Sequence, residues 1–352
     1  MKVAVYAIAL NEEQFVERWA KSAEGADYLV IADTGSTDRT VEKALALGIQ
    51  VHGVTIKPWR FDDARNLSLA FVPTDADYCI ALDLDEVLQP GWREELEKAH
   101  AQGITRPTYR FITSWLPDGS PGTEFDGFRI HTRFGYRWRF PIHEVPSPYG
   151  IKETKLKMNF EIHHRPDDSK SRGQYLPLLQ MAVQEDPHSE RAAFYYAREL
   201  YFHGLYDQST QEFKRYLKMA WWSPEKASAM NYLARVDKDN AKHWCEQSMA
   251  EYEGSREPMV LMARHYYEKD WNECLCWVQK ALSIKEKRLD YIVEDFAWGF
   301  EVYDLGALAA YNLGQYRLAI EYGEKAVELN PTDERLSRNL VFYKAKENDE
   351  SL

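Results

Sequence analysis

The chain has 352 residues, a length at which a single hydrophobic core usually gives way to about two domains. Hydrophobic residues make up 45% and charged residues 28%, which excludes a wholly disordered chain. The formal net charge of −12 argues against a protein that holds nucleic acid through a general basic surface, but it leaves room for a local basic patch.

The sequence predicts neither export nor a membrane span. The four cysteines have no spacing typical of a zinc site and are expected to be reduced thiols: Cys79, Cys245, Cys274 and Cys276. The first apolar run, 3–10, leads directly into Asn11-Glu12-Glu13 and not into a small-residue cleavage site. No run approaches the roughly 20 apolar residues that cross a bilayer. We therefore expect a cytoplasmic protein without a membrane span.

Short apolar runs alternate with helical stretches over the first hundred residues. In chain order, the pattern predicts strand 3–10, helix 12–22, strand 28–32, helix 38–47, strand 50–54, helix 62–72 and strand 78–82. This alternation is typical of βαβ units with a mainly parallel sheet. Because ligands bind at the carboxyl ends of the strands in such sheets, the residues that directly follow each strand are the candidate site.

The pattern changes twice further along the chain. Residues 101–165 are rich in Thr, Arg and aromatic residues, with Gly and Pro between them, which predicts antiparallel strands. Within 129–174, ten Lys or Arg stand against five Asp or Glu, which suits either a solvated face or a site for a diphosphate or an acidic acceptor. From residue 171 the sequence is almost entirely helical. The expected domains are therefore 1–170, mixed α/β, and 171–352, all-α.

The helical half contains an internal repeat. Gly204-x-Tyr206 matches Gly314-x-Tyr316, and a poorer copy begins at Asp270-Trp271. The stretch 313–331 resembles the second half of a tetratricopeptide repeat, in which small residues let two helices approach and aromatic side chains fill the gap. We expect three or four degenerate helix pairs. Such a domain suits an extended peptide, and it would equally serve as a surface for homo-oligomer formation.

Two aspartates follow the predicted strand 78–82. Asp83 and Asp85 are spaced i, i+2, and on an extended chain this spacing points both carboxylates toward one ligand. Hard divalent cations such as Mg²⁺ and Mn²⁺ take one or two carboxylates, while phosphate oxygens and water complete the shell. A solvated turn gives the same pattern, so the two aspartates need support from other motifs.

Three further motifs lie beside predicted strand ends: Asn-Glu-Glu at 11–13, Asp-Thr-Gly-Ser-Thr-Asp at 33–38 and Phe-Asp-Asp-Ala-Arg-Asn at 61–66. Together with Asp83-Leu84-Asp85, in this order, they resemble a family 2 glycosyltransferase of the GT-A fold, and specifically its members with tetratricopeptide repeats. The resemblance covers the first hundred residues well and 100–165 loosely. It implies a GT-A mixed-sheet domain followed by an all-α repeat domain. It also implies a nucleotide-sugar donor, with UDP favoured, and Mn²⁺ or Mg²⁺.

The resemblance assigns roles residue by residue. The residues that would bind the nucleotide sugar are Asn11, Glu12, Glu13, Asp33, Arg65, Asn66, Asp83 and Leu84. Asp85 would bind the metal ion, with Asp83 beside it. A histidine after the sheet completes the metal shell in this family, and His164 matches that position better than His163, which alternation places on the other face of the strand.

The segment 33–38 has a second interpretation that is compatible with the first. It is also the pattern of a turn followed by a helix N-terminus, in which Ser36 or Thr37 caps the helix. Asp38 would then favour the positive end of the helix dipole.

Glu144 is the candidate catalytic residue. The segment 140–144, Phe-Pro-Ile-His-Glu, resembles the Ile-His-Glu segment in the acceptor half of the family's site. An inverting transfer, which the resemblance implies, needs a base that takes the proton of the acceptor hydroxyl. A role for Glu144 in orienting His143 or an arginine is an equally good interpretation. The arginines that could hold developing negative charge are Arg129, Arg133, Arg137 and Arg139.

The predicted function is therefore a metal-dependent glycosyltransferase that moves a sugar to an acceptor hydroxyl. The repeats favour a polypeptide acceptor. The basic stretch with its interleaved Tyr136, Trp138 and Phe140 favours a modified nucleic acid whose base is flipped out, and a saccharide or small molecule stays open.

Two other functions compete with this one. The first is a non-catalytic repeat scaffold with a degenerate nucleotide-sugar-binding domain, and the intact Asp83, Asp85, Arg65 and Asn66 argue against it. The second is a nucleotidyltransferase, which the lack of a glycine-rich basic phosphate loop near residue 1 disfavours.

Overall fold

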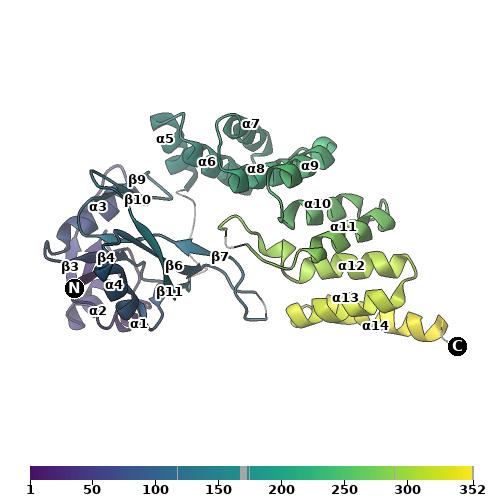
Figure 1. Ribbon diagram of the computed structural model, residues 1–352, viewed down its shortest axis with the longest axis horizontal. Helices are drawn as coiled ribbons and strands as arrows, with labels where there is room; N and C mark the ends of the chain where they lie inside the picture. Colours follow the sequence, from purple (N-terminus) through teal and green to yellow (C-terminus); the bar gives the residue numbers. More distant parts are fainter. Residues whose placement is uncertain (117, 167–172, 174, 289, 351–352) are drawn as a thin grey trace. The chain divides into compact units, whose positions relative to one another are not determined.

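The computed structural model describes residues 1–352 except for 117, 167–172, 174, 289 and 351–352. The chain divides into two compact units, which are drawn in Figure 1. The α/β unit comprises Met1–Thr113 and Phe125–Pro187, and the helical unit comprises Ser114–Glu124 and His188–Leu352. The predicted domain boundary at 170/171 lies outside the described residues. Within those that are described, no helix is long and apolar enough to cross a membrane.

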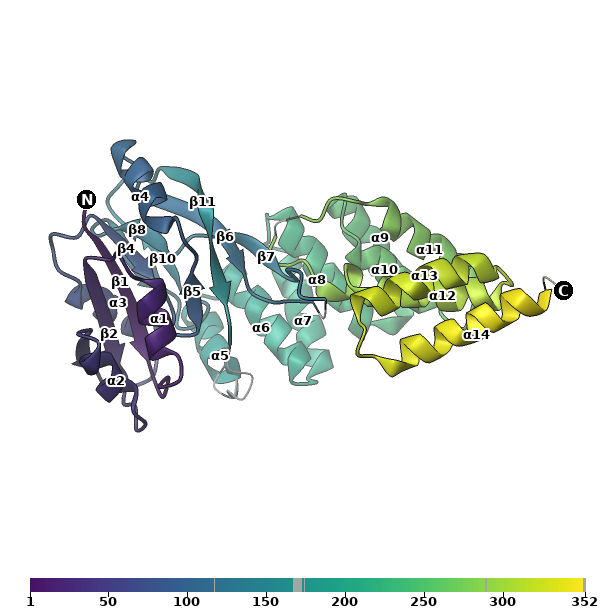
Figure 2. The ribbon, with the colours of Figure 1, turned by 90° about the horizontal axis from the view of Figure 1, so that it is seen from below.

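The α/β unit is built on a five-stranded sheet with the order β3-β2-β1-β4-β8. Its strands are β1 (Val3–Ala9), β2 (Tyr28–Asp33), β3 (Gln50–Gly53), β4 (Tyr78–Ala81) and β8 (Ile130–Thr132). The first four run parallel to one another, and β8 is antiparallel to β4. Strands β2, β1 and β4 lie side by side in Figure 2. The carboxyl ends of β2, β1 and β4 therefore meet at one edge of the sheet.

Helices cover both faces of this sheet. Their bounds are α1 (Val16–Ser22), α2 (Thr40–Ala46), α3 (Phe61–Phe71) and α4 (Trp92–Ala101). Side chains from α1, α2 and α4 enter one hydrophobic core, and side chains from α3 enter another. All four parallel strands and the first three helices lie within a few residues of their predicted positions.

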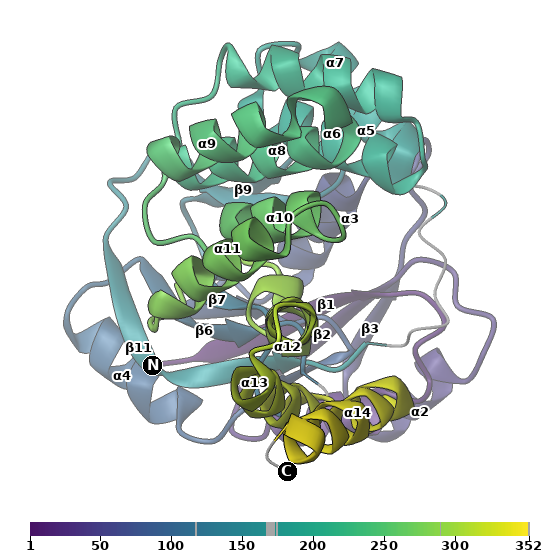
Figure 3. The same cartoon turned by 90° about the vertical axis from the view of Figure 1, so that its right-hand side faces the viewer.

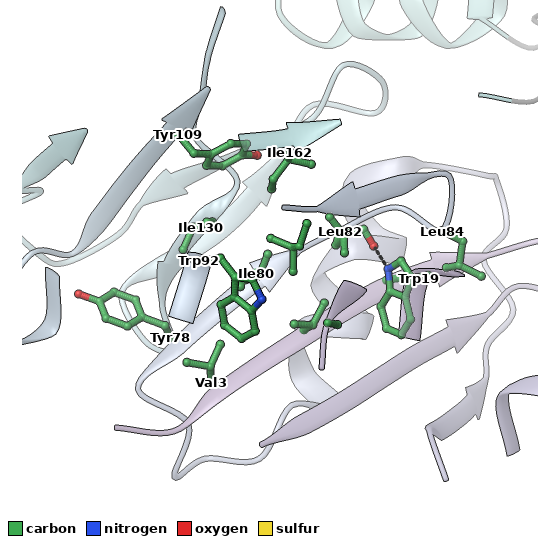
Figure 4. Packing of buried hydrophobic residues seen from close by; sticks show 14 of the residues in the cluster. Val3, Trp19, Tyr78, Ile80, Leu82, Leu84, Trp92, Tyr109, Ile130 and Ile162 are labelled. Carbon is green, nitrogen blue, oxygen red and sulfur yellow. Dashed lines mark hydrogen bonds between the residues drawn. The ribbon is translucent and has the colours of Figure 1, made fainter. Parts of the chain in front are cut away.

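Alternation along β1 explains the two cores. Val5 and its neighbours at every second position enter the larger core together with Trp19, whereas Tyr6 points to the opposite face and packs with Trp138. Figure 4 shows the larger core, where the Trp19 indole donates a hydrogen bond of 3.0 Å to the carbonyl of Leu82. This bond fixes α1 beside the end of β4, directly before Asp83.

The region predicted to be antiparallel is partly parallel. Its second sheet has the order β5-β11-β6-β7, with β5 (Glu86–Leu88), β6 (Arg106–Ile112), β7 (Glu124–Gly127) and β11 (Lys155–His164). β11 runs antiparallel to β5 but parallel to β6, so the prediction is wrong for the β6–β11 pair. Residue composition predicts that a segment forms a strand, but it does not predict which other strand that segment pairs with. The expected antiparallel pairing is found between β9 (Tyr136–Arg139) and β10 (Val145–Pro148).

The helical unit consists of helix pairs that follow one another along the chain, as Figure 3 shows. Helix α5 (Tyr175–Glu185) precedes it in the α/β unit. The pairs are α6 (Glu190–Phe202) with α7 (Tyr206–Leu217), α8 (Ser223–Val236) with α9 (Ala241–Glu251), α10 (Glu257–Tyr266) with α11 (Trp271–Ser283), and α12 (Phe300–Asn312) with α13 (Tyr316–Leu329). Helix α14 (Glu334–Glu350) packs on α13. The described residues thus hold four pairs, and the predicted fold class is confirmed.

The predicted repeat copies occupy equivalent turns. Gly204 and Gly314 lie between the two helices of their pairs, and both have φ of 72°. This left-handed conformation favours glycine because a Cβ atom would clash with the backbone. In the poorer copy Glu268 takes the corresponding conformation, with φ of 61°, and Asp270 caps α11 through the backbone N–H groups of Asn272 and Glu273.

Gly306 of α12 lies where neighbouring helices approach each other closely. A Cβ atom here would lie 2.7 Å from the Tyr322 ring and 2.9 Å from Val278, so neither neighbour leaves room for it. We expect Gly306→Ala to lower the free energy of unfolding, because overpacking costs roughly 1–3 kcal/mol and exceeds the ~0.5–1 kcal/mol that alanine gains in a helix. Urea denaturation checks this. Gly53→Ala, where a Cβ meets open space, is the control. If Gly306→Ala and the unsubstituted chain had equal urea midpoints, the expectation would be contradicted.

A buried carboxylate is expected to make the helical unit sensitive to pH. Glu257 of α10 is 4% exposed and accepts hydrogen bonds from the Ser255 hydroxyl and the backbone N–H of Glu294. Burial raises its pKa, although these hydrogen bonds act in the opposite direction. With the folded pKa above the unfolded one, its contribution to stability is fully present below the unfolded pKa and is lost as pH rises through the folded pKa.

Glu257→Gln should therefore gain stability relative to the original chain as pH rises above the unfolded pKa of about 4.3, because the neutral amide has no charge to bury. Urea denaturation of both chains at pH 5 and pH 8 measures the difference. A constant difference between the two pH values would contradict the expectation.

Candidate functional site

The loops after β1 and β2 bind each other through the residues predicted to hold the donor. The Asn11 side-chain oxygen accepts from the backbone N–H of Thr37 at 2.8 Å, and the Asn11 backbone donates to the Ser36 hydroxyl at 2.9 Å. Glu13 accepts from the backbone of Arg39 at 2.9 Å. Glu12 donates its backbone N–H to the Thr40 hydroxyl at 2.7 Å. These contacts fix the two loops against each other at the carboxyl edge of the sheet.

Asp33 and Asp38 shape the second loop from within. Asp33, 7% exposed, accepts from the backbone N–H groups of Gly35 and Ser36 at 3.1 Å. Asp38 accepts from the backbone and the hydroxyl of Thr40, where α2 begins. The expectation that Ser36 or Thr37 caps α2 is therefore wrong, because Asp38 supplies the acceptor nearest to the helix start.

The two aspartates after β4 lie at a turn, where an extended chain was expected, and they contact different side chains. The backbone N–H of Glu86 donates to the Asp83 carbonyl at 2.9 Å, which forms a turn in place of an extended chain. The Asp83 carboxylate consequently forms ion pairs with two arginines, whereas the Asp85 carboxylate contacts His164. Between them the Leu84 side chain lies in the hydrophobic core.

Asp83 belongs to a chain of alternating charges. Its two carboxylate oxygens lie 2.5 Å from Arg65 and 2.8 Å from Arg129. Arg65 also donates to Glu144 at 2.9 Å, and Arg129 also pairs with Glu86. Three carboxylates and two guanidiniums therefore form one network, from Glu144 to Glu86, at the carboxyl end of β4.

Burial and charge act against each other in this network. Burial alone would raise the pKa of Asp83, but Arg65 and Arg129 hold that pKa well below its usual range. Burial raises the pKa of Glu86 to about 7, and the neighbouring Asp83 and Asp85 add to the effect while Arg129 opposes it. The sequence motif contained Glu86 without giving it a role. Its short spacing from Asp83 was the available signal, but its partner Arg129 directly precedes β8, more than 40 residues along the chain, and could not be read from the motif.

Asp85 and His164 come together from distant parts of the chain. His164 Nε2 lies 3.3 Å from Asp85 Oδ2, because β11 runs beside β5 directly after the turn. Both side chains are partly exposed, at 30% for His164 and 17% for Asp85. Burial alone would lower the pKa of His164, but the hydrogen bond and charge of Asp85 raise it. His163 instead lies 2.7 Å from Glu161.

These two groups fit one side of a divalent cation site. A carboxylate oxygen and an imidazole nitrogen that point at each other are suitable donors for Mn²⁺. Among the residues that the structure describes, no group of three or more His, Cys, Asp or Glu side chains could hold a metal ion. Asp85 and His164 would supply two ligands, and phosphate oxygens and water would supply others.

Asn66 has a structural role next to Arg65. Its amide donates to the carbonyl of Trp138 at 3.0 Å and accepts from the backbone N–H of Trp138 at 2.8 Å, so it joins α3 to β9. The Arg65 guanidinium lies over the Trp138 ring at 5.2 Å. Asn66 also lines an open hollow of about 430 Å³. The other residues of this hollow are Thr55, Ile56, Asp63 and Leu67.

Glu144 follows a segment with an unusual backbone. His143 has φ of 51°, and its ring contacts the edge of Tyr175 at 6.0 Å. The Glu144 side chain is 12% exposed and holds the Arg65 guanidinium. The structure thus contains the contact with an arginine that was one of the two interpretations of Glu144.

Of the four arginines considered for developing negative charge, Arg129 reaches Asp83. Arg133 instead donates to the carbonyl of Val72. Arg137 and Arg139 are exposed on β9. Lys170 and Arg172 of the basic stretch lie outside the described residues.

Two family models match the chain, one in each unit. Residues 5–112 match glycosyl transferase family 2, and residues 258–346 match the prolyl 4-hydroxylase peptide-substrate-binding domain, a repeat of the tetratricopeptide type. The α/β unit thus contains a family 2 glycosyltransferase domain, and the helical unit contains tetratricopeptide-like repeats. The resemblance predicted from the four motifs and from the helical repeat is confirmed.

A curated relative from Rickettsia bellii, described as an uncharacterized glycosyltransferase, is 32% identical over 97 residues. The match covers 27% of this chain and 32% of the relative, so the chain spans about a third of the length of that protein. Among solved structures, glucosyl-3-phosphoglycerate synthase from Mycobacterium tuberculosis has 18% identity and a TM-score of 0.36, covering 52% of this chain and 77% of that one. The Cut9–Hcn1 hetero-tetramer of APC/C has 13% identity and a TM-score of 0.41, covering 49% and 33%. These structural likenesses are too distant to carry an argument.

Proposed function

We propose that this protein is a metal-dependent glycosyltransferase that moves a sugar from a UDP-linked donor to a hydroxyl of a polypeptide acceptor, with inversion at the sugar carbon. The observation that carries the proposal is the pairing of Asp85 with His164 beside the Asp83 network, at the carboxyl ends of the parallel strands. The family 2 glycosyltransferase domain at 5–112 supports it.

The donor would lie along this edge. The hollow beside Asn66 is open and of a size that suits part of a nucleotide. The loops held by Asn11, Glu13 and Asp33 present backbone groups at the ends of β1 and β2. Arg65 and Arg129 place two positive charges next to Asp83, and they would attract the donor's diphosphate.

Asp85 and His164 would hold Mn²⁺ or Mg²⁺, which would neutralise the diphosphate and make the nucleoside diphosphate a better leaving group. Glu144 would accept the proton of the acceptor hydroxyl as that hydroxyl attacks the sugar. Its ion pair with Arg65 fixes the direction of the carboxylate, so orienting an arginine and acting as the base are compatible roles.

The helical unit supports a polypeptide acceptor. Stacked helix pairs present long surfaces to extended chains. The model that matches 258–346 describes a domain that binds peptide substrates in another enzyme. The alternatives to a polypeptide acceptor are a saccharide and a modified nucleic acid.

The test is slow hydrolysis of the donor by the purified full chain. Each common nucleotide sugar is incubated with Mn²⁺, with and without EDTA, and release of the nucleoside diphosphate is followed. Metal-dependent release from a UDP-sugar is the expected result. Release of pyrophosphate from a nucleoside triphosphate and a sugar phosphate would instead indicate a nucleotidyltransferase. If neither turnover nor donor binding is detected, the scaffold function replaces the proposal.

A further inference from the structure

Three buried side chains of the α/β unit form a hydrogen-bonded chain next to Arg65. Tyr6 of β1 and His131 of β8 are 0% exposed, and Trp138 of β9 is 1% exposed. The Trp138 indole Nε1–H donates to the Tyr6 hydroxyl at 2.8 Å, and this hydroxyl lies 2.9 Å from His131 Nε2. His131 Nδ1 lies 2.8 Å from the backbone carbonyl of Thr132. Three strands that are far apart in the sequence are thus joined at one hydroxyl.

The direction of each hydrogen bond follows from the groups that make it. The carbonyl oxygen of Thr132 can only accept, so His131 Nδ1 carries a proton. Burial lowers the pKa of His131 to about 4, so the ring is neutral near neutral pH and its Nε2 is an acceptor. Tyr6 therefore donates its hydroxyl proton to His131 and accepts from Trp138. Each ring nitrogen and the hydroxyl proton then has a partner, which a buried polar chain needs in order to be stable.

Trp138 connects this chain to helix α3. The Arg65 guanidinium lies over the Trp138 ring, 5.2 Å from its centre, in a cation–π contact. The Asn66 side chain bonds both backbone polar groups of Trp138, at 2.8 Å and 3.0 Å. Asn66 therefore fixes the backbone of Trp138, and Tyr6 fixes the far end of its side chain. The ring under Arg65 is held at both ends.

The Trp138 ring also answers a question that the sequence left open. Trp138 and Tyr136 belong to the interleaved aromatic residues that were considered for binding a flipped base. In the structure Trp138 lies in a hydrophobic core with Tyr6, and Tyr136 is 7% exposed. Both rings are thus buried, and Trp138 contacts the candidate site from the interior of the α/β unit.

Arg65 is the group that this support affects. Its Nε–H donates to Glu144 at 2.9 Å, and its Nη1 lies 2.5 Å from Asp83. Two carboxylates thus bind the guanidinium through its nitrogen atoms, while Trp138 contacts it through the aromatic ring. A shift of the ring would change the distances to both carboxylates, because the guanidinium is rigid and planar.

We propose that Tyr6 and His131 are positioning residues for the Arg65 guanidinium. They fix the Trp138 ring, and this ring fixes the guanidinium between its two carboxylate partners. The consequence for sugar transfer rests on the proposed function, in which Arg65 attracts the diphosphate of the donor. The positioning itself does not depend on that function and can be measured without a substrate.

Tyr6→Phe tests the proposal, because it removes the hydroxyl and keeps the ring. The measurement is the ¹⁵N nuclear magnetic resonance signal of the Arg65 Nε–H group in the full chain, identified by its absence from the spectrum of Arg65→Lys. We expect Tyr6→Phe to shift this signal and to make its hydrogen exchange about tenfold faster, since the loss of a buried hydrogen bond makes local opening easier.

Tyr78→Phe is the matched control. Tyr78 is 1% exposed, donates its hydroxyl to the carbonyl of Ile104 and belongs to the other hydrophobic core of the same sheet. This variant also loses one buried hydroxyl, and urea denaturation compares its stability with that of Tyr6→Phe. It should leave the Arg65 signal unchanged.

An unchanged Arg65 signal in folded Tyr6→Phe would overturn the proposal, and so would an equal change in Tyr78→Phe. Far-UV circular dichroism confirms that each variant is folded. His131→Phe, which removes the acceptor of the Tyr6 hydroxyl, replaces Tyr6→Phe if that variant does not fold. Donor hydrolysis is measured in parallel. If the unsubstituted chain hydrolyses no donor while the Arg65 signal responds as expected, the proposed function fails and the positioning of Arg65 stands.

Discussion

Asp85→Ala is expected to reduce metal-dependent release of nucleoside diphosphate at least about a hundredfold, because the variant loses one of the two side chains available to hold the cation. His164→Ala should lose less, since the carboxylate that carries the negative charge remains. The measurement is the initial rate of donor hydrolysis over a range of Mn²⁺ concentrations. Saturating Mn²⁺ should restore part of the activity of His164→Ala and little of that of Asp85→Ala.

The control for this prediction is Asp126→Ala, which removes a carboxylate from an exposed ion pair with Lys157. Its rate and its dependence on Mn²⁺ should match those of the unsubstituted chain. If Asp85→Ala hydrolysed the donor as fast as the unsubstituted chain, Asp85 would not be a ligand of the cation. If EDTA had no effect on either chain, the reaction would not need a metal ion.

Arg65→Ala is expected to destabilise the α/β unit by about 3–5 kcal/mol, the usual cost of removing one partner from a buried ion pair. Arg65 is 4% exposed and lies between Asp83 and Glu144, so its loss leaves two carboxylates at the end of β4 without their shared cation. Urea denaturation followed by tryptophan fluorescence measures the effect. Arg65→Lys should be intermediate, because an ammonium group keeps the charge but cannot reproduce the forked geometry.

Arg39→Ala is the matched control for this loss. Arg39 pairs with Glu42 at the surface, with both side chains more than half exposed, and such pairs contribute about 0–1 kcal/mol. If Arg65→Ala and Arg39→Ala had equal effects, Arg65 would not hold the network together. A loss of activity in Arg65→Ala without a loss of stability would instead place Arg65 in donor binding alone.

The sequence identified the candidate site motif by motif but not its internal partners. Asp83 and Asp85 follow a run of apolar residues, and Asn11 and Asp33 follow two others, so local patterns were enough to locate them. The partner of Asp85 was predicted through the resemblance, and the structure brings His164 within 3.3 Å of it. Nothing local indicated that Arg129, directly before β8, would share Asp83 with Arg65.

The sequence by itself determined the order of strands and helices, the parallel first sheet and the repeated helix pairs, because hydrophobic periodicity and turn glycines such as Gly204 and Gly314 act over a few residues. Only the tertiary structure decided that β6 pairs in parallel with β11, and that the residues after β4 form a turn. Strand pairing and buried charge depend on partners far along the chain, and their energies are settled when the whole sheet is assembled.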